Sequence, residues 1–272
     1  KRESILNVLL INNEMLLRLG FFLGIFVSMA AWETAAPRRA LQQSKWTRWS
    51  RNLVLTFLNA FLLRLVFPAA AVGAALFAEQ KGWGLFHATP APKWAAGLFS
   101  VILLDMAIYA QHVAFHKIPI FWRLHRMHHT DLDIDVTTGA RFHPVEIIAS
   151  MAIKIGVVMA IGAPAWAVVI FEILLNATSM FNHSNIFLNL RADRWIRRVV
   201  VTPDMHRVHH SVRIAETDSN YGFNLSIWDR LFGTYRPQPA AGHESMKIGL
   251  ANYRSDKWLK LGWMLLVPFS RY

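Results

Sequence analysis

Histidines at helical spacing are the residues of this chain best suited to chemistry. Residues 111–130 read QHVAFHKIPIFWRLHRMHHT and hold five of the twelve histidines, as HxxxH and then HxxHH; a second HxxHH follows at 206–210. Because positions i, i+3 and i+4 share one face of a helix, we expect each cluster to direct its imidazoles at one point. Eight imidazoles exceed the needs of one metal ion and suit two: His112, His116, His125, His128, His129, His206, His209 and His210.

The absence of cysteine narrows the metals that these histidines could bind. With no cysteine among 272 residues, disulfides, thiolate sites and iron–sulfur clusters are excluded. Imidazole remains as the main ligand, and it suits iron, zinc, copper or nickel. Two divalent ions held by imidazole alone carry a high positive charge, so we expect acidic side chains to orient the rings through their other nitrogen. The available carboxylates are Asp105, Asp131, Asp133, Asp135, Glu146, Asp204 and Asp218.

The composition places the chain in a membrane. Hydrophobic residues make up 54% of it, with eleven Trp and eighteen Phe, and several apolar runs approach the length that spans a bilayer. The formal net charge of +12 is explained by membrane topology and by attraction to anionic lipid, so no nucleic-acid partner is expected. We therefore predict an all-α, polytopic membrane protein.

Apolar segments predict about four transmembrane helices. They cover residues 15–32, 53–78, 94–111 and 147–181, the last as a helical hairpin broken at Gly162-Ala163-Pro164. The loop between the first two segments is rich in Arg and Lys, which places it in the cytoplasm. His87 then lies in an outer loop and is excluded from the site. The apolar stretch 258–269 is too short to span and is expected at the membrane interface.

The topology is inferred from apolar segments and basic loops alone, yet it brings the histidines together. It places all three clusters, His143 and His183 on the cytoplasmic side, in the segments 112–146 and 182–257. We therefore expect one integral-membrane domain, residues 1–272, whose cytoplasmic helical part holds a histidine-rich di-metal site.

At this point a family resemblance can be stated. The order HxxxH, HxxHH and, after a hydrophobic hairpin, HxxHH resembles the fatty acid hydroxylase and sterol desaturase superfamily of integral-membrane di-iron oxygenases. The resemblance covers about residues 93–236, and RLHRMHHTDLDIDVTTGARFHPVE, VTPDMHRVHHS and DSNYGFNLSIWDRLFGTYRP are similar to bacterial sterol desaturase family proteins. It implies that the eight histidines are metal ligands and that His183, in MFNHSN, supplies another. His143, in RFHP, is either a ligand or a cap of the helix that begins at Pro144. Candidates for further ligands, or for partners of the ligand rings, are Asp105, Asp135, Asn182 and Asp218.

The resemblance implies an O2-dependent oxidoreductase that acts on an unactivated C–H bond of a membrane lipid. The cofactor would be two iron ions, which zinc can replace on purification. The product would be an alcohol or an alkene, and alkylglycerol ether lipids, ornithine lipids, sterols or hopanoids and fatty acyl chains all remain open as substrates. Two electrons would come from a separate ferredoxin-, flavodoxin- or cytochrome-type donor. The location would be the bacterial inner membrane, with the metal site on the cytoplasmic side.

Two other classes of function use the same histidines. A metal transporter would place polar ligands near the middle of the membrane on broken helices, whereas these lie at helix ends and in the segments that follow. A membrane zinc hydrolase needs an open metal position and a general base, but the sequence contains no HExxH and more histidines than that chemistry requires. Both alternatives are less consistent with the pattern than a di-iron enzyme.

Three further features have two interpretations each. Five aromatic residues either line a lipid slot or are ordinary packing residues: Trp94, Phe99, Trp122, Trp166 and Phe171. Asn220, Tyr221 and the motif WDRLFGTY at 228–235 form either a lid over the metals or a helix and turn that close the cytoplasmic domain. Arg64, inside the second apolar segment, is either functional or, as we expect, snorkels or pairs with another helix.

Overall fold

The computed structural model describes residues 11–270, which form helices and loops with only isolated β-bridges among them. The all-helical class predicted from the sequence is therefore confirmed. Five helical segments are long and apolar enough to cross a membrane: Glu14–Ala35, Lys45–Ala88, Lys93–Lys117, Pro144–Ile161 and Ala165–His183. The number exceeds the expected four because each arm of the hairpin is long enough to count by itself.

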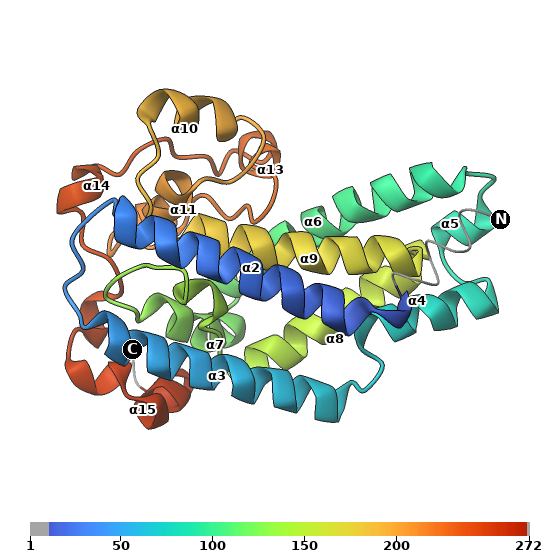
Figure 1. The fold of residues 1–272 in the computed structure, drawn as a ribbon, viewed down its shortest axis with the longest axis horizontal. Helices are drawn as coiled ribbons and strands as arrows, with labels where there is room; N and C mark the ends of the chain where they lie inside the picture. The colour runs from blue at the N-terminus through green and yellow to red at the C-terminus, as the bar shows by residue number, and fades with distance from the viewer. Residues whose placement is uncertain (1–10, 271–272) are drawn as a thin grey trace.

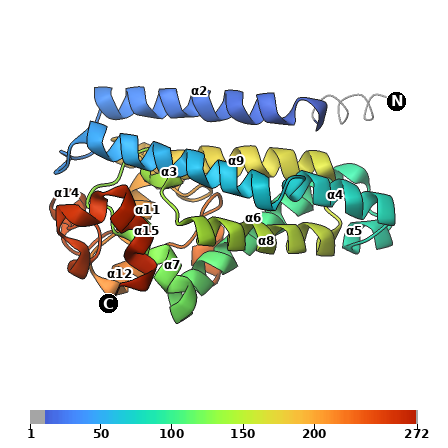
Figure 2. The ribbon, with the colours of Figure 1, turned by 90° about the horizontal axis from the view of Figure 1, so that it is seen from below.

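The long helices run side by side in a bundle. They are α2 (Glu14–Ala35), α3 (Lys45–Val66), α6 (Lys93–Lys117), α8 (Pro144–Ile161) and α9 (Ala165–His183). Helix α2 forms an outer layer that packs on α9, whereas α3 packs on α8 (Figures 1 and 2). Helix α6 packs against both α8 and α9, and its outer face, which includes Trp94 and Phe99, is exposed.

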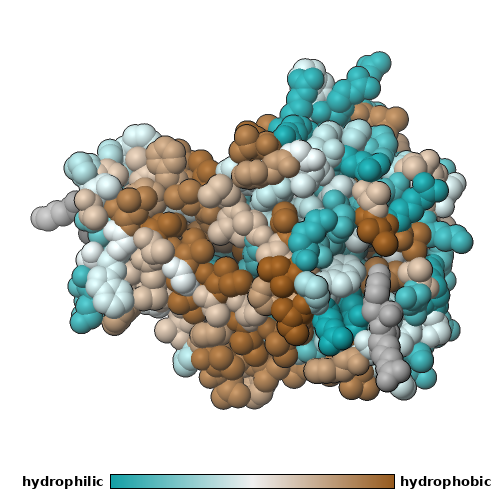
Figure 3. Space-filling view, turned by 180° about the vertical axis from the view of Figure 1, so that it is seen from behind, coloured by the Kyte–Doolittle hydropathy of each residue, from teal (hydrophilic) through white to brown (hydrophobic). Residues whose placement is uncertain are grey.

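The short helices gather at one end of the bundle (Figure 1). They are α7 (Pro119–His129), η1 (Thr138–Ala140), α10 (Leu190–Ile196), α11 (Pro203–His209), α12 (Ile214–Thr217), α13 (Ile227–Leu231), α14 (Gly242–Ser245), η2 (Ala251–Tyr253), η3 (Asp256–Leu259), α15 (Leu261–Leu266) and η4 (Val267–Phe269). Hydrophilic side chains cover much of this end, and hydrophobic ones dominate the neighbouring helical part (Figure 3). The two surfaces match a water-facing domain and a membrane-facing bundle.

The second apolar segment is divided in two. Helix α3 begins at Lys45, where the Ser44 side chain accepts a hydrogen bond from the Thr47 amide, and it ends at Val66. Pro68 has no amide hydrogen and cannot continue the helix, so a new helix, α4 (Ala70–Lys81), follows. The short α5 (Leu85–Ala88) carries His87 at the end of the bundle opposite the other histidines (Figure 1).

The hairpin of α8 and α9 is set by its end residues. His143 caps α8 by accepting a hydrogen bond from the Val145 amide at 3.2 Å, and Pro144 occupies the first turn. Gly162 ends α8 with φ of 67°, a left-handed conformation that favours glycine, and Pro164 precedes α9. Helix α9 then returns to the histidine end and finishes at His183.

Residues 258–269 pack on α7. Met264 and Val267 share a buried apolar cluster with Met127 of α7. Arg126 of α7 donates a hydrogen bond to the Val267 carbonyl at 2.6 Å. The segment predicted at the membrane interface therefore serves as a cover for α7, although Phe269 stays exposed.

Candidate metal centre

Nine buried histidines form two groups, each with nitrogen atoms within 4.8 Å of one another. Group A consists of His112, His116, His125, His129 and His209. Group B consists of His128, His183, His206 and His210. All nine residues predicted as metal ligands are thus brought together, and the outer-loop His87 belongs to neither group.

Each HxxHH motif contributes to both groups. On α7, His125 and His129 point into group A while His128 points into group B. On α11 the division is reversed, with His209 in group A and His206 and His210 in group B. Neighbouring positions of a helix point about 100° apart, so one helix wedged between two sites can serve both. The expectation that each cluster aims at a single point is corrected accordingly.

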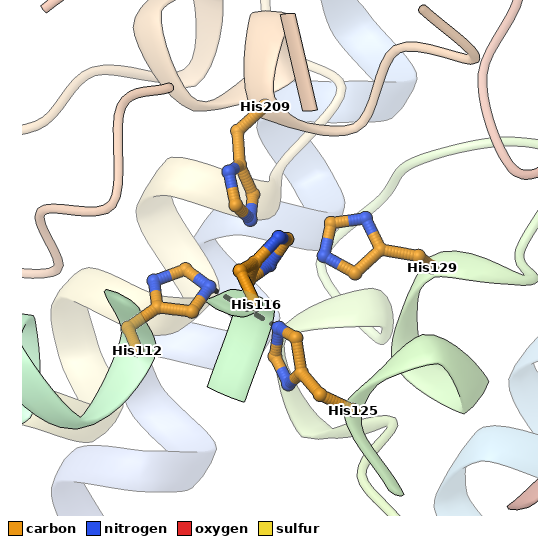
Figure 4. Close-up of side chains that lie close together, drawn as sticks. All are labelled: His112, His116, His125, His129 and His209. Atoms are coloured by element: carbon orange, nitrogen blue, oxygen red, sulfur yellow. Dashed lines mark hydrogen bonds between the residues drawn. The ribbon is translucent and has the colours of Figure 1, made fainter. Parts of the chain in front are cut away.

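Group A draws its rings from three helices. His112 and His116 lie one turn apart on α6, and α7 and α11 face them. Figure 4 shows the five rings of the group pointing toward a common centre. The Nε2 atoms of His112 and His125 approach to 3.2 Å.

The outer nitrogen of five rings is fixed by a specific acceptor. In each ring Nδ1 donates one hydrogen bond. His125 donates to the Glu146 carboxylate at 2.6 Å. The other four rings donate to backbone carbonyls: His112 to Tyr221 at 2.7 Å, His209 to Ser219 at 2.7 Å, His128 to Arg141 at 3.2 Å and His183 to Ser179 at 2.8 Å. A carbonyl oxygen can only accept, so Nδ1 carries the proton in those rings and Nε2 keeps its lone pair. Rings oriented in this way are prepared to ligate a metal through Nε2.

The pair His128 and His183 has an arrangement consistent with a metal ion bound by both rings. Both rings have Nδ1–H bonded to a carbonyl, and their Nε2 atoms lie only 3.1 Å apart. Burial, followed by the neighbouring His183, lowers the pKa of His128 well below its ordinary value, so the ring is neutral. Two lone pairs therefore face each other with no proton between them. A shared metal ion removes this repulsion.

Unpaired buried nitrogens support the same conclusion. His129 and His210 are each 1% exposed, and neither ring nitrogen has a hydrogen-bond partner among the described residues. Burial, and then the neighbouring histidines, lowers the pKa of both rings well below the ordinary value. Because buried polar atoms are costly when unpaired, these neutral nitrogens fit metal ligation.

The other proposed ligands lie outside the two groups. Asp105 accepts hydrogen bonds from Trp228 Nε1 at 2.8 Å and from the Leu225 amide at 3.1 Å, so it fixes the loop after the second HxxHH. Asn182 likewise donates to the Phe223 carbonyl at 3.0 Å. Neither side chain is placed as a ligand.

Asp135 and Asp131 belong to a buried ion network behind α7. Arg48 of α3 forms ion pairs with both, at 2.8 Å for Asp131. Although burial alone would raise the pKa of Asp131, Arg48 and Arg141 lower it to about 2. The network holds the loop from residue 130 to 141, whose Arg141 carbonyl orients His128.

Asp218 and His143 have different positions. Asp218 Oδ1 lies 3.4 Å from Nδ1 of His116, so it faces group A from outside, and its other oxygen accepts from Lys117 at 2.7 Å. His143 caps α8, and its Nε2 donates to the Leu265 carbonyl at 3.3 Å. Of the two interpretations of His143, the structure therefore favours the cap.

The motif WDRLFGTY supports the histidines indirectly. It forms α13 and a turn at Gly233, where φ is 70°. Asp229 accepts hydrogen bonds from the amides of Tyr221 and Gly222 at 2.7 and 2.8 Å. The Tyr221 carbonyl in turn orients His112. The motif is thus a helix and turn that also holds a partner of a ligand ring.

A cavity of about 290 Å³ reaches group A from within the bundle. His112, His125 and Glu146 line one end, and apolar side chains such as Phe115, Phe142 and Met151 line the walls. It lies between two pairs of packed helices. One pair is α2 with α9, and the other is α3 with α8. Its size and apolar lining suit part of an alkyl chain.

The five aromatic residues with two interpretations do not line this cavity. Trp94 and Phe99 are 66% and 52% exposed, while Phe171 is fully buried in the core. Trp166 packs over Gly97, where a Cβ atom would lie 2.1 Å from the indole ring. Of the two interpretations of these residues, ordinary packing or bilayer-facing positions therefore fit these four side chains.

Trp122 lines a second cavity, of about 270 Å³, at the hydrophilic end. His116 and Asp218 share this cavity. The Trp122 ring lies 4.8 Å from the His116 ring and 5.5 Å from the His129 ring, between centroids. Group A is therefore approached from two sides, one within the bundle and one at the hydrophilic end.

Comparison with known proteins agrees with this geometry. The family described as Fatty acid hydroxylase matches residues 97–234, a segment that contains all nine histidines. The chain belongs to the fatty acid hydroxylase family. Membership accounts for a helical membrane protein with buried histidine clusters.

Several curated relatives within this family are similar to the chain. Ornithine lipid hydroxylase OlsE of Rhizobium tropici is 28% identical over 174 residues, 64% of this chain and 50% of the relative. Alkylglycerol monooxygenase of Xenopus tropicalis is 33% identical over 136 residues, 50% of this chain and 29% of the relative. Fatty acid hydroxylase vlmA of a Lecanicillium species is 27% identical over 157 residues, 52% and 42% of the two chains. The chain spans half or less of the length of these relatives, and no solved structure matches it.

Proposed function

We propose that the chain is an O2-dependent, di-iron oxidoreductase that hydroxylates a C–H bond of a membrane lipid. The observation that carries the proposal is the pair of buried histidine groups, with two rings of group A, His112 and His125, at the end of a mainly apolar cavity. The names of the relatives, which are hydroxylases and a monooxygenase, favour hydroxylation over desaturation. Fatty acyl, ornithine-lipid and alkylglycerol substrates all contain the alkyl chain that this cavity suits.

The roles of the residues follow from their positions. Group A and group B would each hold one iron ion. When bound, the two ions would supply activation of O2 and oxidation of the C–H bond with two external electrons. The four carbonyls and Glu146 hold the rings in one tautomer, which pre-organises Nε2 for binding. The apolar walls exclude water and place an alkyl chain against His112 and His125.

The geometry disfavours the two alternatives. Both groups lie at one end of the long helices, whereas transport ligands are expected near mid-membrane. For hydrolysis, a carboxylate should face the metal as a general base. Glu146 instead lies behind His125, on the Nδ1 side of the ring.

We propose that electrons enter through the second cavity, beside Trp122. The indole lines this cavity beside His116 of group A, and its ring lies 5.5 Å from the His129 ring. Exposed cations flank the lining residues: Lys117, Arg123 and Arg213. Such a rim suits a separate donor with an acidic surface, as charge complementarity accelerates docking. Because the same end carries many basic residues, we place it in the cytoplasm, with the chain in a bacterial inner membrane.

Labelling with isotopic O2 tests the proposed function. Cells that express the chain are given labelled oxygen, and their lipids are compared by mass spectrometry with cells that express His209→Ala or His87→Ala. We expect one labelled oxygen in a lipid of the wild-type and His87→Ala cells and none with His209→Ala. Metal uptake into proteoliposomes that depends on His209, without any labelled lipid, would instead support a transporter.

A further inference from the structure

Three charged side chains lie at the end of the apolar cavity away from the histidines. Glu172 of α9 is 1% exposed and lies between two cations. Its Oε1 accepts from Lys154 of α8 at 2.9 Å, and its Oε2 lies 3.0 Å from Arg18 of α2. All three line the same cavity as His112 and His125. We call Arg18, Lys154 and Glu172 the charge triad.

The length of α8 separates the triad from group A. Glu146, which bonds to His125, and Lys154 both line the cavity and are eight positions apart on this helix. At 1.5 Å per residue the separation along the axis is about 12 Å. Between them most wall residues are apolar, such as Ile147 and Met151 on α8, and the polar pair Gln111 and Ser150 is joined by its own hydrogen bond at 2.8 Å. The cavity therefore has one ligand-bearing end, one charged end and a mainly apolar middle.

The charge triad, with two cations and one carboxylate, has a net charge of +1. A single cation would neutralise Glu172, yet both Arg18 and Lys154 contact it, and both carboxylate oxygens are occupied. Glu14 lies one turn before Arg18 on α2, but no ion pair joins them in the part of the chain that the structure describes. A net charge within membrane helices is costly and marks functional sites. A bound anion would remove this cost.

We propose, on the basis of the proposed function, that the charge triad binds an acidic group with a single negative charge on the lipid substrate. One surplus cation matches a carboxylate or a phosphodiester, whereas a phosphate monoester carries more charge. The alkyl chain then follows the apolar middle, and the carbon that lies at His112 and His125 is set by its distance from the acidic group. The triad thus determines the position of oxidation as well as the class of lipid.

Binding of matched probes tests this assignment without turnover. The purified protein in nanodiscs is titrated with hexadecanoate, hexadecanol and palmitoyl lysophosphatidylglycerol, at a pH where the carboxyl group is ionised. The variants are Lys154→Met, which keeps the length of the side chain, and Lys154→Arg, which restores the charge. Arg64→Met is the matched control, because Arg64 is an exposed arginine of α3 that does not line the cavity. Thermal unfolding of each variant verifies that it is folded.

We expect wild type to bind at least one anionic probe about tenfold more tightly than hexadecanol. Lys154→Met should lose this preference, while Lys154→Arg and Arg64→Met keep it. Preference for hexadecanoate identifies a carboxylate ligand, and preference for the lysophospholipid alone identifies a phosphodiester. Equal binding of all three probes to wild type, or an unchanged preference in folded Lys154→Met, would overturn the proposal. An intact preference without labelled lipid in the O2 experiment would overturn the proposed function and leave the anion site standing.

Discussion

Replacement of Glu146 by glutamine should weaken metal retention in group A. The carboxylate accepts from Nδ1 of His125 at 2.6 Å and is 2% exposed, so this bond is shielded from solvent. The amide oxygen of glutamine still accepts a hydrogen bond, but it lacks the charge that increases the basicity of Nε2. Loss of such a partner typically reduces metal affinity by about 10–100-fold. This range corresponds to about 1.4–2.8 kcal/mol, as expected for a hydrogen bond to a charged group.

The assay is titration of the iron-loaded protein with a chelator, with the iron that remains bound measured by elemental analysis. Glu33→Gln is a matched control, because Glu33 is also buried and its Oε1 accepts from the Val136 and Asn185 amides, both at 2.7 Å. A glutamine oxygen can replace it there without touching a histidine. We expect Glu146→Gln to release one of two ions at a lower chelator concentration and Glu33→Gln to match wild type. Identical release curves for the three proteins would refute the role assigned to Glu146.

Three further predictions concern stability and electron supply. Arg48 helps to lower the pKa of buried Asp131 to about 2. The ionised carboxylate therefore stabilises the fold when the pH is above the pKa of Asp131 in the unfolded chain, and this stabilisation is lost as the pH falls from about 4 through about 2. The gap in unfolding free energy between wild type and Asp131→Asn, on the order of 2 kcal/mol at neutral pH, should therefore close over that range in thermal melts, and a constant gap would contradict it. Arg123→Glu should slow reduction by an acidic donor about tenfold at low salt, and stopped-flow rates that match wild type at every salt concentration would exclude this docking surface. Gly97→Ala should lower the unfolding free energy by about 1–3 kcal/mol, because its Cβ would lie 2.1 Å from Trp166; an unchanged melting temperature would show that the indole moves away freely.

The position of the histidines could be predicted largely from local sequence. HxxxH and HxxHH set which imidazoles share a helix face, and the apolar segments set which helix ends meet. The division of each HxxHH between two groups could not be predicted, because it depends on α7 and α11 lying between the two sites. A sequence pattern does not state which helices will flank a given face.

Partners that act through the backbone leave little signal in a sequence. The carbonyls of Ser219 and Tyr221 orient His209 and His112, yet any residue type offers a carbonyl. Glu146 was one of seven candidate carboxylates, and only the packing of α8 against α7 selects it. The lining of the apolar cavity could not be predicted for a similar reason, since it comes from six α-helices whose mutual rotation the sequence does not reveal.

Metal content tests the central claim most directly. The protein is purified without added metal from cells grown on Mössbauer-active iron, and wild type is compared with His128→Ala, His129→Ala and the exposed control His87→Ala. Because His129 belongs to group A and His128 to group B, each single variant should lose one site. We expect close to two irons per chain in wild type and His87→Ala, with a coupled Mössbauer spectrum, and about one uncoupled iron in each of the other variants. One metal or none in wild type, unchanged in His128→Ala and His129→Ala, would contradict a di-metal centre built by the two groups.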